Sequence, residues 1–295
     1  TEKTGIEVHL LTGKDDALLS RLKMEGGASP ADLLITADVA RLHRAKEMGL
    51  TQPVESTALN EAIPTNLRDS DNHWFGMTSR ARPIIYAKDR VNPEKLSTYE
   101  ALTDEQWKGR ICIRSSSNVY NQSLIASAIA ANGVEATEAW VEGLVANFAR
   151  PPAGGDTDQL KAAAAGVCDI AIANTYYLAR LVRSDKASDN AVADQLAVFW
   201  PNQNDRGTHF NISGAALTAS SKNRDEAVAL LEYMVSQEAQ EWYAEVNNEY
   251  PVVAGVESSD VLKAFGTAKS DNVALSKLGE LNQEALRLMD RAGWK

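Results

Sequence analysis

The chain has 295 residues, of which 44% are hydrophobic and 24% charged, a composition typical of a globular protein with one large or two ordinary domains. Its net charge of −10 disfavours binding to nucleic acid and to anionic membrane surfaces. No apolar run approaches the ~20 residues that a membrane-spanning helix needs, so we expect no membrane insertion.

Strand-like and helix-like patterns alternate along the chain. In chain order we expect a strand at 6–12, a helix at 15–26, a strand at 31–37, a helix at 38–49, an extended segment at 74–91, a strand at 109–115, helices at 120–133, 136–148 and 157–166, a strand at 167–174, a helix at 176–184, extended segments at 197–203 and 207–219, a helix at 223–246 and two helices within 258–292. This alternation predicts an α/β fold with a mostly parallel sheet. The residues before position 6 resemble a helix, whereas an α/β domain normally begins with a strand, so we expect a first strand ahead of Thr1.

Two helix starts carry capping signals. Asp38 stands where the helix over 38–49 is expected to begin. Asn223 and Glu226 have the spacing of a capping box at the start of the helix over 223–246. We therefore expect Asp38 and Asn223 to cap these helices.

Tyr176 and Tyr177 stand side by side directly after the strand expected at 167–174. Ligands of α/β proteins bind at the carboxyl ends of strands, and at a strand-to-helix turn two adjacent side chains can point into one crevice. Two converging phenols suit a hard, highly charged cation, because such a metal can displace the phenol proton. Core packing of one ring and exposure of the other hydroxyl would explain the same pair.

A second polar element stands at the start of the helix expected at 120–133. Ser116, Ser117 and Asn118 precede a third tyrosine, Tyr120. The free N–H groups and positive dipole of a helix start favour an anion. Ordinary helix capping explains the same residues.

Arg80 and Arg82 share one face of the extended segment at 74–91. A buried arginine at this place could hold a planar oxyanion through two parallel hydrogen bonds. A surface arginine would only be solvated, and the pattern leaves open which of the two faces a site.

The remaining reactive residues give little support for an enzyme. Cys112 and Cys168 lie in strand-like runs and could be buried thiols or one disulfide. The four histidines are scattered without metal-ligand spacing. The chain has no GxSxG, HExxH, P-loop or GxGxxG motif.

The most informative segments are GRICIRSSSNVYNQSLIASAIA, AAAAGVCDIAIANTYYLARL and HFNISGAALTASSKNRDEAVALLEYMVSQEAQEWYAEVNNEYPV. Together they resemble the bacterial periplasmic ferric-ion-binding proteins, the substrate-binding components of iron ABC transporters. ADLLITADVARLHRAKEMGL and SRARPIIYAKDRV are similar to the same family, so the resemblance covers essentially the whole chain. The Asn-x-Tyr-Tyr motif after a strand and the NNEYPV stretch are its most specific parts.

The resemblance implies a type II periplasmic-binding-protein fold. In this fold two α/β lobes are joined by hinge strands that cross between them, and Fe(III) is held in the interlobe cleft. One lobe would comprise residues 1–80 and 207–257, without the first strand. The other would comprise residues 81–206 and 258–295.

The resemblance also implies a set of site residues. The implied iron ligands are Tyr120, Tyr176 and Tyr177. A small anion, expected to be carbonate, would complete the coordination, with partners at Ser117, Asn174 and one of Arg80 and Arg82. The family further supports a disulfide between Cys112 and Cys168, which fits an oxidising periplasm.

The sequence departs from the family pattern at two places. Some members carry a glutamate ligand where Ala37 stands here, and Asp38 beside it is better explained as a helix cap. The family also begins with a strand that often carries a histidine or tyrosine contact. A residue ahead of Thr1 could therefore join the coordination.

The resemblance implies capture of Fe(III) in the periplasm and its delivery to an ABC permease in the inner membrane. We expect a monomer that binds no nucleic acid and catalyses no reaction. The alternative is the same fold binding a small organic cation, such as thiamine or a polyamine, between the tyrosines. An enzyme on this fold is a third possibility, but the sequence offers no acid–base pair or nucleophile for it.

Overall fold

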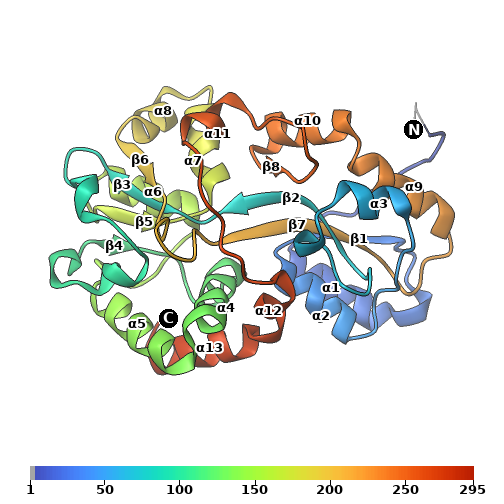
Figure 1. The fold of residues 1–295 in the computed structure, drawn as a ribbon, viewed down its shortest axis with the longest axis horizontal. Coiled ribbons are helices and arrows are strands. Elements are labelled where there is room, and N and C mark those ends of the chain that lie inside the picture. The colour runs from blue at the N-terminus through green and yellow to red at the C-terminus, as the bar shows by residue number, and fades with distance from the viewer. Residues whose placement is uncertain (1–3) are drawn as a thin grey trace.

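The computed structural model describes residues 4–295, which form two groups of elements joined by strands that cross the middle of the molecule (Figure 1). Each group contains a four-stranded sheet. The first sheet has the order β1 (Leu33–Ala37), β7 (Phe210–Leu217), β2 (Phe75–Ala81) and β8 (Tyr250–Pro251). The second has the order β4 (Ile111–Cys112), β5 (Ile170–Ile172), β3 (Ile84–Ala87) and β6 (Leu196–Phe199).

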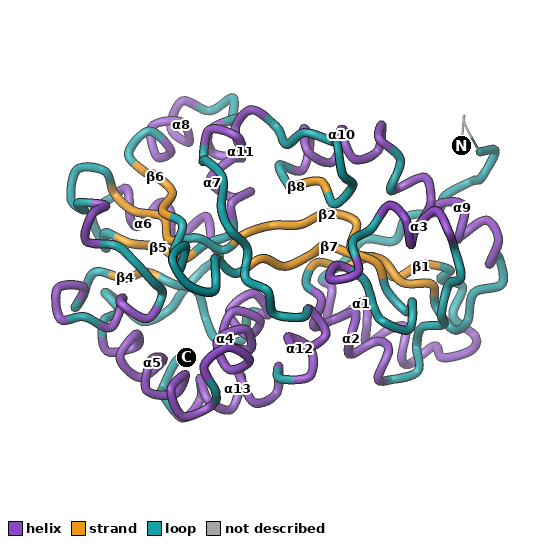
Figure 2. The backbone as a smooth tube through the Cα atoms, in the orientation of Figure 1, coloured by secondary structure: helices purple, strands orange, loops and turns teal. Residues whose placement is uncertain are grey.

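Helices surround both sheets (Figure 2). They are α1 (Asp15–Glu25), α2 (Val39–Glu47), α3 (Thr57–Ala62), α4 (Val119–Asn132), α5 (Val134–Ala146), α6 (Asp156–Ala164), α7 (Thr175–Val182), α8 (Ala187–Ala193), α9 (Arg224–Met234), α10 (Gln237–Asn247), α11 (Asp260–Ala264), α12 (Leu275–Glu280) and α13 (Asn282–Arg291). The expected two-lobed α/β fold is confirmed. We call the lobe built on the β1-β7-β2-β8 sheet the first lobe and the other the second lobe.

Two of the crossing segments are tied together where they pass from one lobe to the other. β2 leads into β3 of the second sheet, and the Arg82 N–H donates to the carbonyl of His209, which precedes β7 (3.0 Å). The fully buried Tyr99 joins the same two segments, because its hydroxyl donates to the Arg82 carbonyl (2.7 Å) and accepts from the His209 N–H (3.2 Å). The crossing point is thus held by backbone and side-chain hydrogen bonds together.

The expectation of mostly parallel sheets is wrong. Among the strands of residues 4–295, β4 and β5 pair in parallel, whereas the pairings of β1, β2, β3, β6, β7 and β8 are antiparallel. The reason is the crossing chain. β2 leaves the first lobe and β7 returns to it, so the two strands lie beside each other in opposite directions.

Three further expectations need correction. Residues 6–12 form no strand, and Val8, Leu10 and Leu11 are exposed, because no neighbouring strand pairs with their backbone. The helix at 223–246 is two helices, since the Ser236 hydroxyl caps α10 by accepting from the Ala239 N–H. The C-terminal region holds α11, α12 and α13, one helix more than expected.

Of the two predicted caps, Asp38 is confirmed and Asn223 is wrong. The Asp38 carboxylate accepts from the Ala40 N–H at the start of α2 (3.1 Å). Asn223 caps nothing with its side chain, which instead donates to Asp32 (3.0 Å). That tie holds the start of α9 to the loop before β1.

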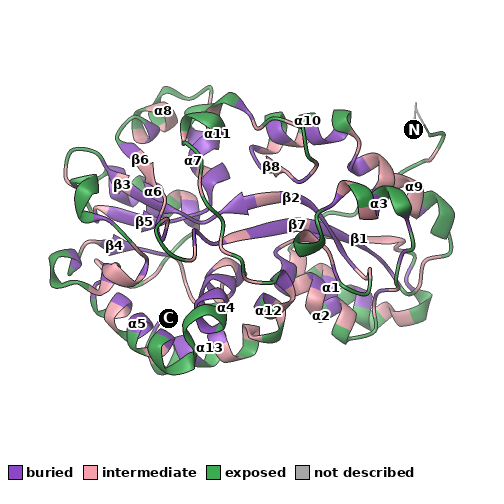
Figure 3. Cartoon of the chain, viewed as in Figure 1, coloured by how far each residue is buried: buried purple, intermediate pink, exposed green. Residues whose placement is uncertain are grey.

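Burial concentrates in the sheets and on the inner faces of the helices (Figure 3). The second lobe encloses tryptophan side chains at Trp107, Trp140 and Trp294, each at most 5% exposed. α12 packs against both α2 and α4 and so touches both lobes. Among the described residues, the helices are all too short or too polar to cross a membrane.

Cys112 and Cys168 form the disulfide that the family resemblance suggested. Both are buried, and the bond joins β4 to the loop before β5. It therefore fastens the parallel strand pair in the lobe that carries the tyrosines.

Replacing both cysteines by serine is expected to lower the free energy of unfolding by about 3 kcal/mol, because the bond closes a long loop in the unfolded chain. The sequence separation of the two cysteines is 56. Urea unfolding followed by circular dichroism measures the loss, and wild-type protein under reductant should show a similar one. Equal stability of oxidised, reduced and substituted proteins would contradict the prediction.

Candidate metal centre

Three tyrosines gather at the start of two helices in the second lobe. The hydroxyl oxygens of Tyr120, on α4, and Tyr176, on α7, are 3.2 Å apart. The ring of Tyr177 packs against that of Tyr176, with the centroids 4.4 Å apart. The structure therefore brings together the three residues that the resemblance implies as ligands.

The local backbone explains why adjacent tyrosines end up together. Asn174 follows β5 in an extended conformation and is the N-cap of α7, so the chain turns from strand to helix directly before the pair. Its carbonyl accepts from the Tyr177 N–H (3.2 Å). Tyr176 is buried, whereas Tyr177 is partly exposed. The pair thus reaches from the interior to the surface.

Tyr120 lies in the first turn of α4. Asn118 caps this helix, and its side-chain oxygen accepts from the Tyr120 N–H (3.1 Å). Ser117 is exposed, and its hydroxyl lies 2.9 Å from that of Ser115. The cap at the start of α4 therefore holds the backbone of Tyr120 in place. The hydroxyl of Ser117 contacts Ser115 of the same loop.

Burial shapes the acidity of the tyrosines. Desolvation raises the pKa of Tyr176 well above its ordinary value, and the neighbouring Tyr120 raises it further. Desolvation also raises the pKa of Tyr120, although Arg80 opposes this. Both phenols hold their protons at neutral pH without a metal, so a bound metal has to displace them.

Arg80 is buried and incompletely satisfied. Its Nη1 donates to the hydroxyl of Ser213 (3.2 Å), and its Nη2 lies 3.6 Å from Asp38 without a hydrogen bond. Its guanidinium carbon is 5.2 Å from the centre of the Tyr120 ring. Burial alone would lower the pKa of Arg80, but the charge of Asp38 and others nearby raise it, so the side chain is cationic.

Arg82 is buried as well, but both of its terminal nitrogens are engaged. Nη1 donates to Asp156 (2.8 Å) and to the side-chain oxygen of Asn174 (3.0 Å). Nη2 donates to Asn121 (2.7 Å) and to the second oxygen of Asp156 (3.4 Å). Arg82 therefore connects α4, α6 and the start of α7.

A narrow cavity adjoins Tyr120 where the two lobes meet. It is lined by Asp38, Arg80, Arg82, Tyr120, Asn174, His209 and Asn211. Three buried donors in this lining, Nη2 of Arg80, Nε of Arg82 and Nδ2 of Asn174, have no hydrogen-bond partner among the described residues. Because unpaired buried donors are costly, these donors suit an acceptor such as a small anion. The cavity as it stands is too narrow for a water molecule, so an anion enters only when the lining moves apart. Ser117, Tyr176 and Tyr177 do not line this cavity.

Asp38 does more than the sequence indicated. Besides capping α2 and pairing with Arg80, its carboxylate accepts from the hydroxyl of Ser123 on α4 (2.6 Å). It also accepts from the side chain of Asn211 on β7 (3.0 Å). Asp38 has a positive φ of 83°, which is unusual for a residue other than glycine. This one carboxylate links both lobes beside the tyrosines.

Two arginines that the sequence analysis missed surround the tyrosine rings. The guanidinium of Arg180 lies 4.9 Å from the centre of the Tyr176 ring and 5.8 Å from that of Tyr177. Arg114 lies 5.6 Å from the centre of the Tyr120 ring. Arg180 follows Tyr177 by three residues and Tyr176 by four on one helix, and side chains at these spacings lie on the same helix face. This spacing could have predicted the contacts of Arg180 with both rings. Positive charges here favour the ionised phenols that a metal needs.

The stretch NNEYPV contributes two residues near the site. Glu249 accepts from the hydroxyl of Thr78 and from that of Ser213 (3.2 Å), so it holds β2 and β7. Tyr250 lies beside Thr175, but neither hydroxyl has a hydrogen bond of good geometry. No local sequence pattern shows these contacts, because they join residues far apart in the chain.

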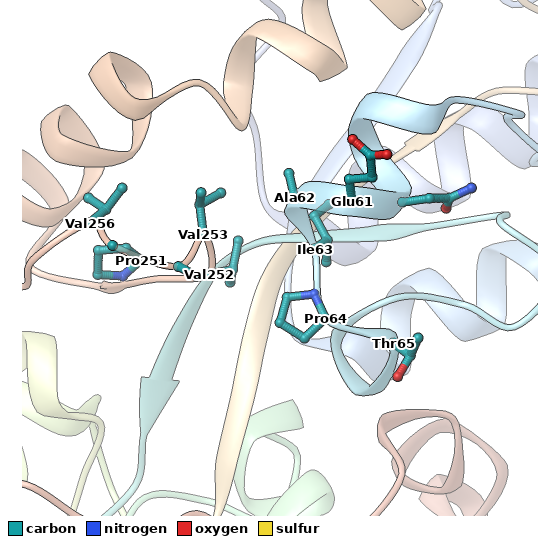
Figure 4. A pocket seen from close by; sticks show the side chains of 12 residues that line it. Glu61, Ala62, Ile63, Pro64, Thr65, Pro251, Val252, Val253 and Val256 are labelled. Carbon is teal, nitrogen blue, oxygen red and sulfur yellow. The ribbon is translucent and has the colours of Figure 1, made fainter.

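A separate groove of about 480 Å³ lies in the first lobe, between residues 60–65 and residues 251–256 (Figure 4). Its lining includes Ile63, Pro64, Val252 and Val253, and none of the three tyrosines. Among the described residues, no group of three histidine, cysteine, aspartate or glutamate side chains is placed to hold a metal. The candidate metal centre is the tyrosine cluster, which rests on its own geometry.

Two lobes joined by crossing strands, with a polar site where they meet, define a solute-binding protein. Residues 28–269 match the family described as bacterial extracellular solute-binding protein, and the chain belongs to this family.

Several relatives of known name span nearly the whole chain. Iron uptake protein A1 of Synechocystis is 51% identical over 100% of this chain and 82% of its own length. The Trichodesmium protein FutA (IdiA), solved in complex with iron and citrate ligands, is 55% identical with a TM-score of 0.97 over 100% of this chain and 93% of that one. The ferric binding protein of Campylobacter jejuni is 43% identical with a TM-score of 0.96, again over 100% and 93%.

Proposed function

We propose that this protein captures Fe(III) in the periplasm through Tyr120, Tyr176 and Tyr177 and delivers it to an ABC permease of the inner membrane. The observation that carries the proposal is the 3.2 Å separation of the Tyr120 and Tyr176 hydroxyls, with the Tyr177 ring beside them. The relatives that carry iron in their names support iron rather than thiamine or a polyamine.

The chemistry of the ligands fits a ferric ion. Phenolate oxygens are hard ligands, and they favour Fe(III) over softer or less charged metals. Arg80, Arg114 and Arg180 supply positive charge around the rings, which helps the phenols to ionise when the metal arrives. Because binding displaces phenol protons, capture weakens as the pH falls.

A small anion, which we expect to be carbonate, completes the coordination. We assign Arg80 and Asn174 as its partners, because each has a buried donor without a protein acceptor. Arg82 uses both terminal nitrogens to hold Asp156, Asn121 and Asn174, and only its Nε stays unpaired, so we assign it a mainly structural role. Ser117 is exposed at the edge of the loop and is not required by this arrangement.

The protein binds its cargo without transforming it and works as a monomer. We propose lobes made of residues 1–80 with 207–257 and of residues 81–206 with 258–295. The lobes close on the metal by a hinge motion at the crossing strands.

The function is tested by adding ferric citrate and bicarbonate to metal-free protein and recording the visible spectrum at pH 8 and pH 6. Tyrosinate bound to Fe(III) gives a broad charge-transfer band, which we expect at pH 8 and at lower intensity at pH 6. Folded protein that shows no band at either pH would rule out the tyrosinate site.

Replacing Arg80 by glutamine is expected to lower the Fe(III) affinity in bicarbonate about 10- to 100-fold, because the anion loses a charged donor. Competition with citrate, with and without bicarbonate, measures the affinity and its dependence on bicarbonate. Arg21→Gln is the control, because Arg21 is half exposed on α1 and pairs with Glu25 of its own helix. If Arg80→Gln kept the full bicarbonate dependence, the assignment of the anion to Arg80 would be wrong.

A further inference from the structure

The helix that carries the tyrosine pair reaches across to the first lobe at its far end. Arg183 is the C-cap residue of α7, directly after Val182. Its Nη1 donates to the backbone carbonyl of Glu245 and to the side-chain oxygen of Asn248 (3.0 Å), and lies 3.4 Å from the Glu245 carboxylate. The side chain of Arg183 therefore binds a helix end in the other lobe.

The end of α10, which Arg183 contacts, favours a positively charged side chain. Glu245 lies in the last turn of α10, where the negative end of the helix dipole and the free carbonyls favour positive charge. Asn248 ends the helix in the left-handed conformation, with φ 56°, and is 3% exposed. Its side-chain oxygen is thus fixed in place as an acceptor for Arg183.

The same short segment, residues 245–250, also reaches the other end of α7. Tyr250 lies beside Thr175, the residue before Tyr176. Between the two contact points, Glu249 holds the hydroxyls of Thr78 and Ser213 on the crossing strands. The segment therefore contacts α7 at both ends and is itself anchored at the junction of the lobes.

We propose that Arg183 is an interlobe latch that positions α7 when the lobes close and so couples closure to retention of iron. Its hydrogen bonds join the helix of Tyr176 and Tyr177 to the first lobe, so they oppose a movement that separates the two lobes at this place. The side chain is 39% exposed, so the latch is of moderate strength and reversible. The role in retaining iron rests on the proposed function, whereas the contacts that join α7 to the first lobe do not.

The test compares Arg183→Gln, Arg183→Lys and a control, Arg287→Gln. Arg287 is 66% exposed and pairs with Glu284 of its own helix, α13. Two quantities are measured for each protein. The first is the rate of iron loss to excess chelator, followed by the charge-transfer band, and the second is the radius of gyration of metal-free protein by small-angle X-ray scattering.

For Arg183→Gln we expect iron loss about threefold to tenfold faster, because a charged donor to several acceptors is removed. The wavelength of the band should stay unchanged, because the tyrosines themselves are intact. Metal-free Arg183→Gln should have a larger radius of gyration than the wild type. Arg183→Lys should restore much of both properties, since an ammonium group can donate to the same acceptors, and the control should match the wild type.

A second variant changes the first-lobe partner of Arg183 instead of Arg183 itself. Asn248→Gly removes one of the acceptors of Arg183 but tolerates the left-handed backbone, so it should reproduce part of the effect of Arg183→Gln even if that variant folds poorly. An unchanged rate and radius of gyration in both variants would overturn the latch, as would a lysine variant no better than glutamine. If none of the proteins binds iron, the proposed function fails, and the scattering measurement still decides whether Arg183 holds the lobes together.

Discussion

Replacing Tyr176 or Tyr177 by phenylalanine is expected to lower the Fe(III) affinity by more than about 100-fold and to shift or abolish the charge-transfer band. Each change removes one phenolate oxygen that would neutralise and coordinate the ferric ion. Phenylalanine keeps the ring, so the packing between the two neighbouring rings is retained. The loss of binding therefore reports on the hydroxyl and not on the fold.

The two variants differ in what else they disturb. Tyr176→Phe also removes the 3.2 Å contact with the Tyr120 hydroxyl, in a side chain that is 5% exposed. Tyr177→Phe alters a partly exposed side chain. Spectra should be recorded with ferric citrate and bicarbonate, and Tyr86→Phe in β3 is the matched control. A normal band in both single variants would leave the pair without a role in metal binding.

Replacing Arg82 by glutamine is expected to lower the free energy of unfolding by about 4 kcal/mol, because it leaves a buried carboxylate without its cation. Asp156 is fully buried, and Arg82 is its closest cationic partner at 2.8 Å. Arg114 also reaches Asp156, but at 3.5 Å and from a partly exposed position. It compensates only in part.

The effect can be separated from the loss of side-chain packing by a double-mutant cycle. Arg82→Gln, Asp156→Asn and the double variant are unfolded in urea and followed by circular dichroism. The double variant should be more stable than the sum of the single losses predicts, because it contains no unpaired buried charge. Strictly additive losses would mean that the two side chains do not stabilise each other.

The tyrosine pair could be predicted because its signal is local. An apolar strand, a turn residue and two phenols follow one another in the chain, and the carboxyl end of a strand is where ligands bind. The capping role of Asp38 was readable for the same reason. The ion pair of Asp38 with Arg80 could not be predicted from the sequence, because the distance between the two residues depends on how β2 and α2 pack.

The roles of Arg80 and Arg82 could not be separated from the sequence. In the sequence the two arginines are two residues apart, so both are expected on the same face of the extended segment. Their roles differ because of partners far away in the chain. Arg82 binds Asp156 and Asn174, whereas Arg80 binds Ser213. Residues 6–12 illustrate the same limit. Their alternation is that of a strand, but a strand forms only where a neighbour supplies the backbone hydrogen bonds.

Tyr99 gives the protein a fixed pivot. Its hydroxyl pins the Arg82 carbonyl to the His209 N–H, so the two crossing segments cannot slide past each other at this point. In the hinge motion proposed above, the lobes rotate about this pin, and displacement grows with distance from it, as at the end of a lever arm. In such a rotation the side chains next to the pin shift least, whereas the ends of the two lobes farthest from it travel furthest.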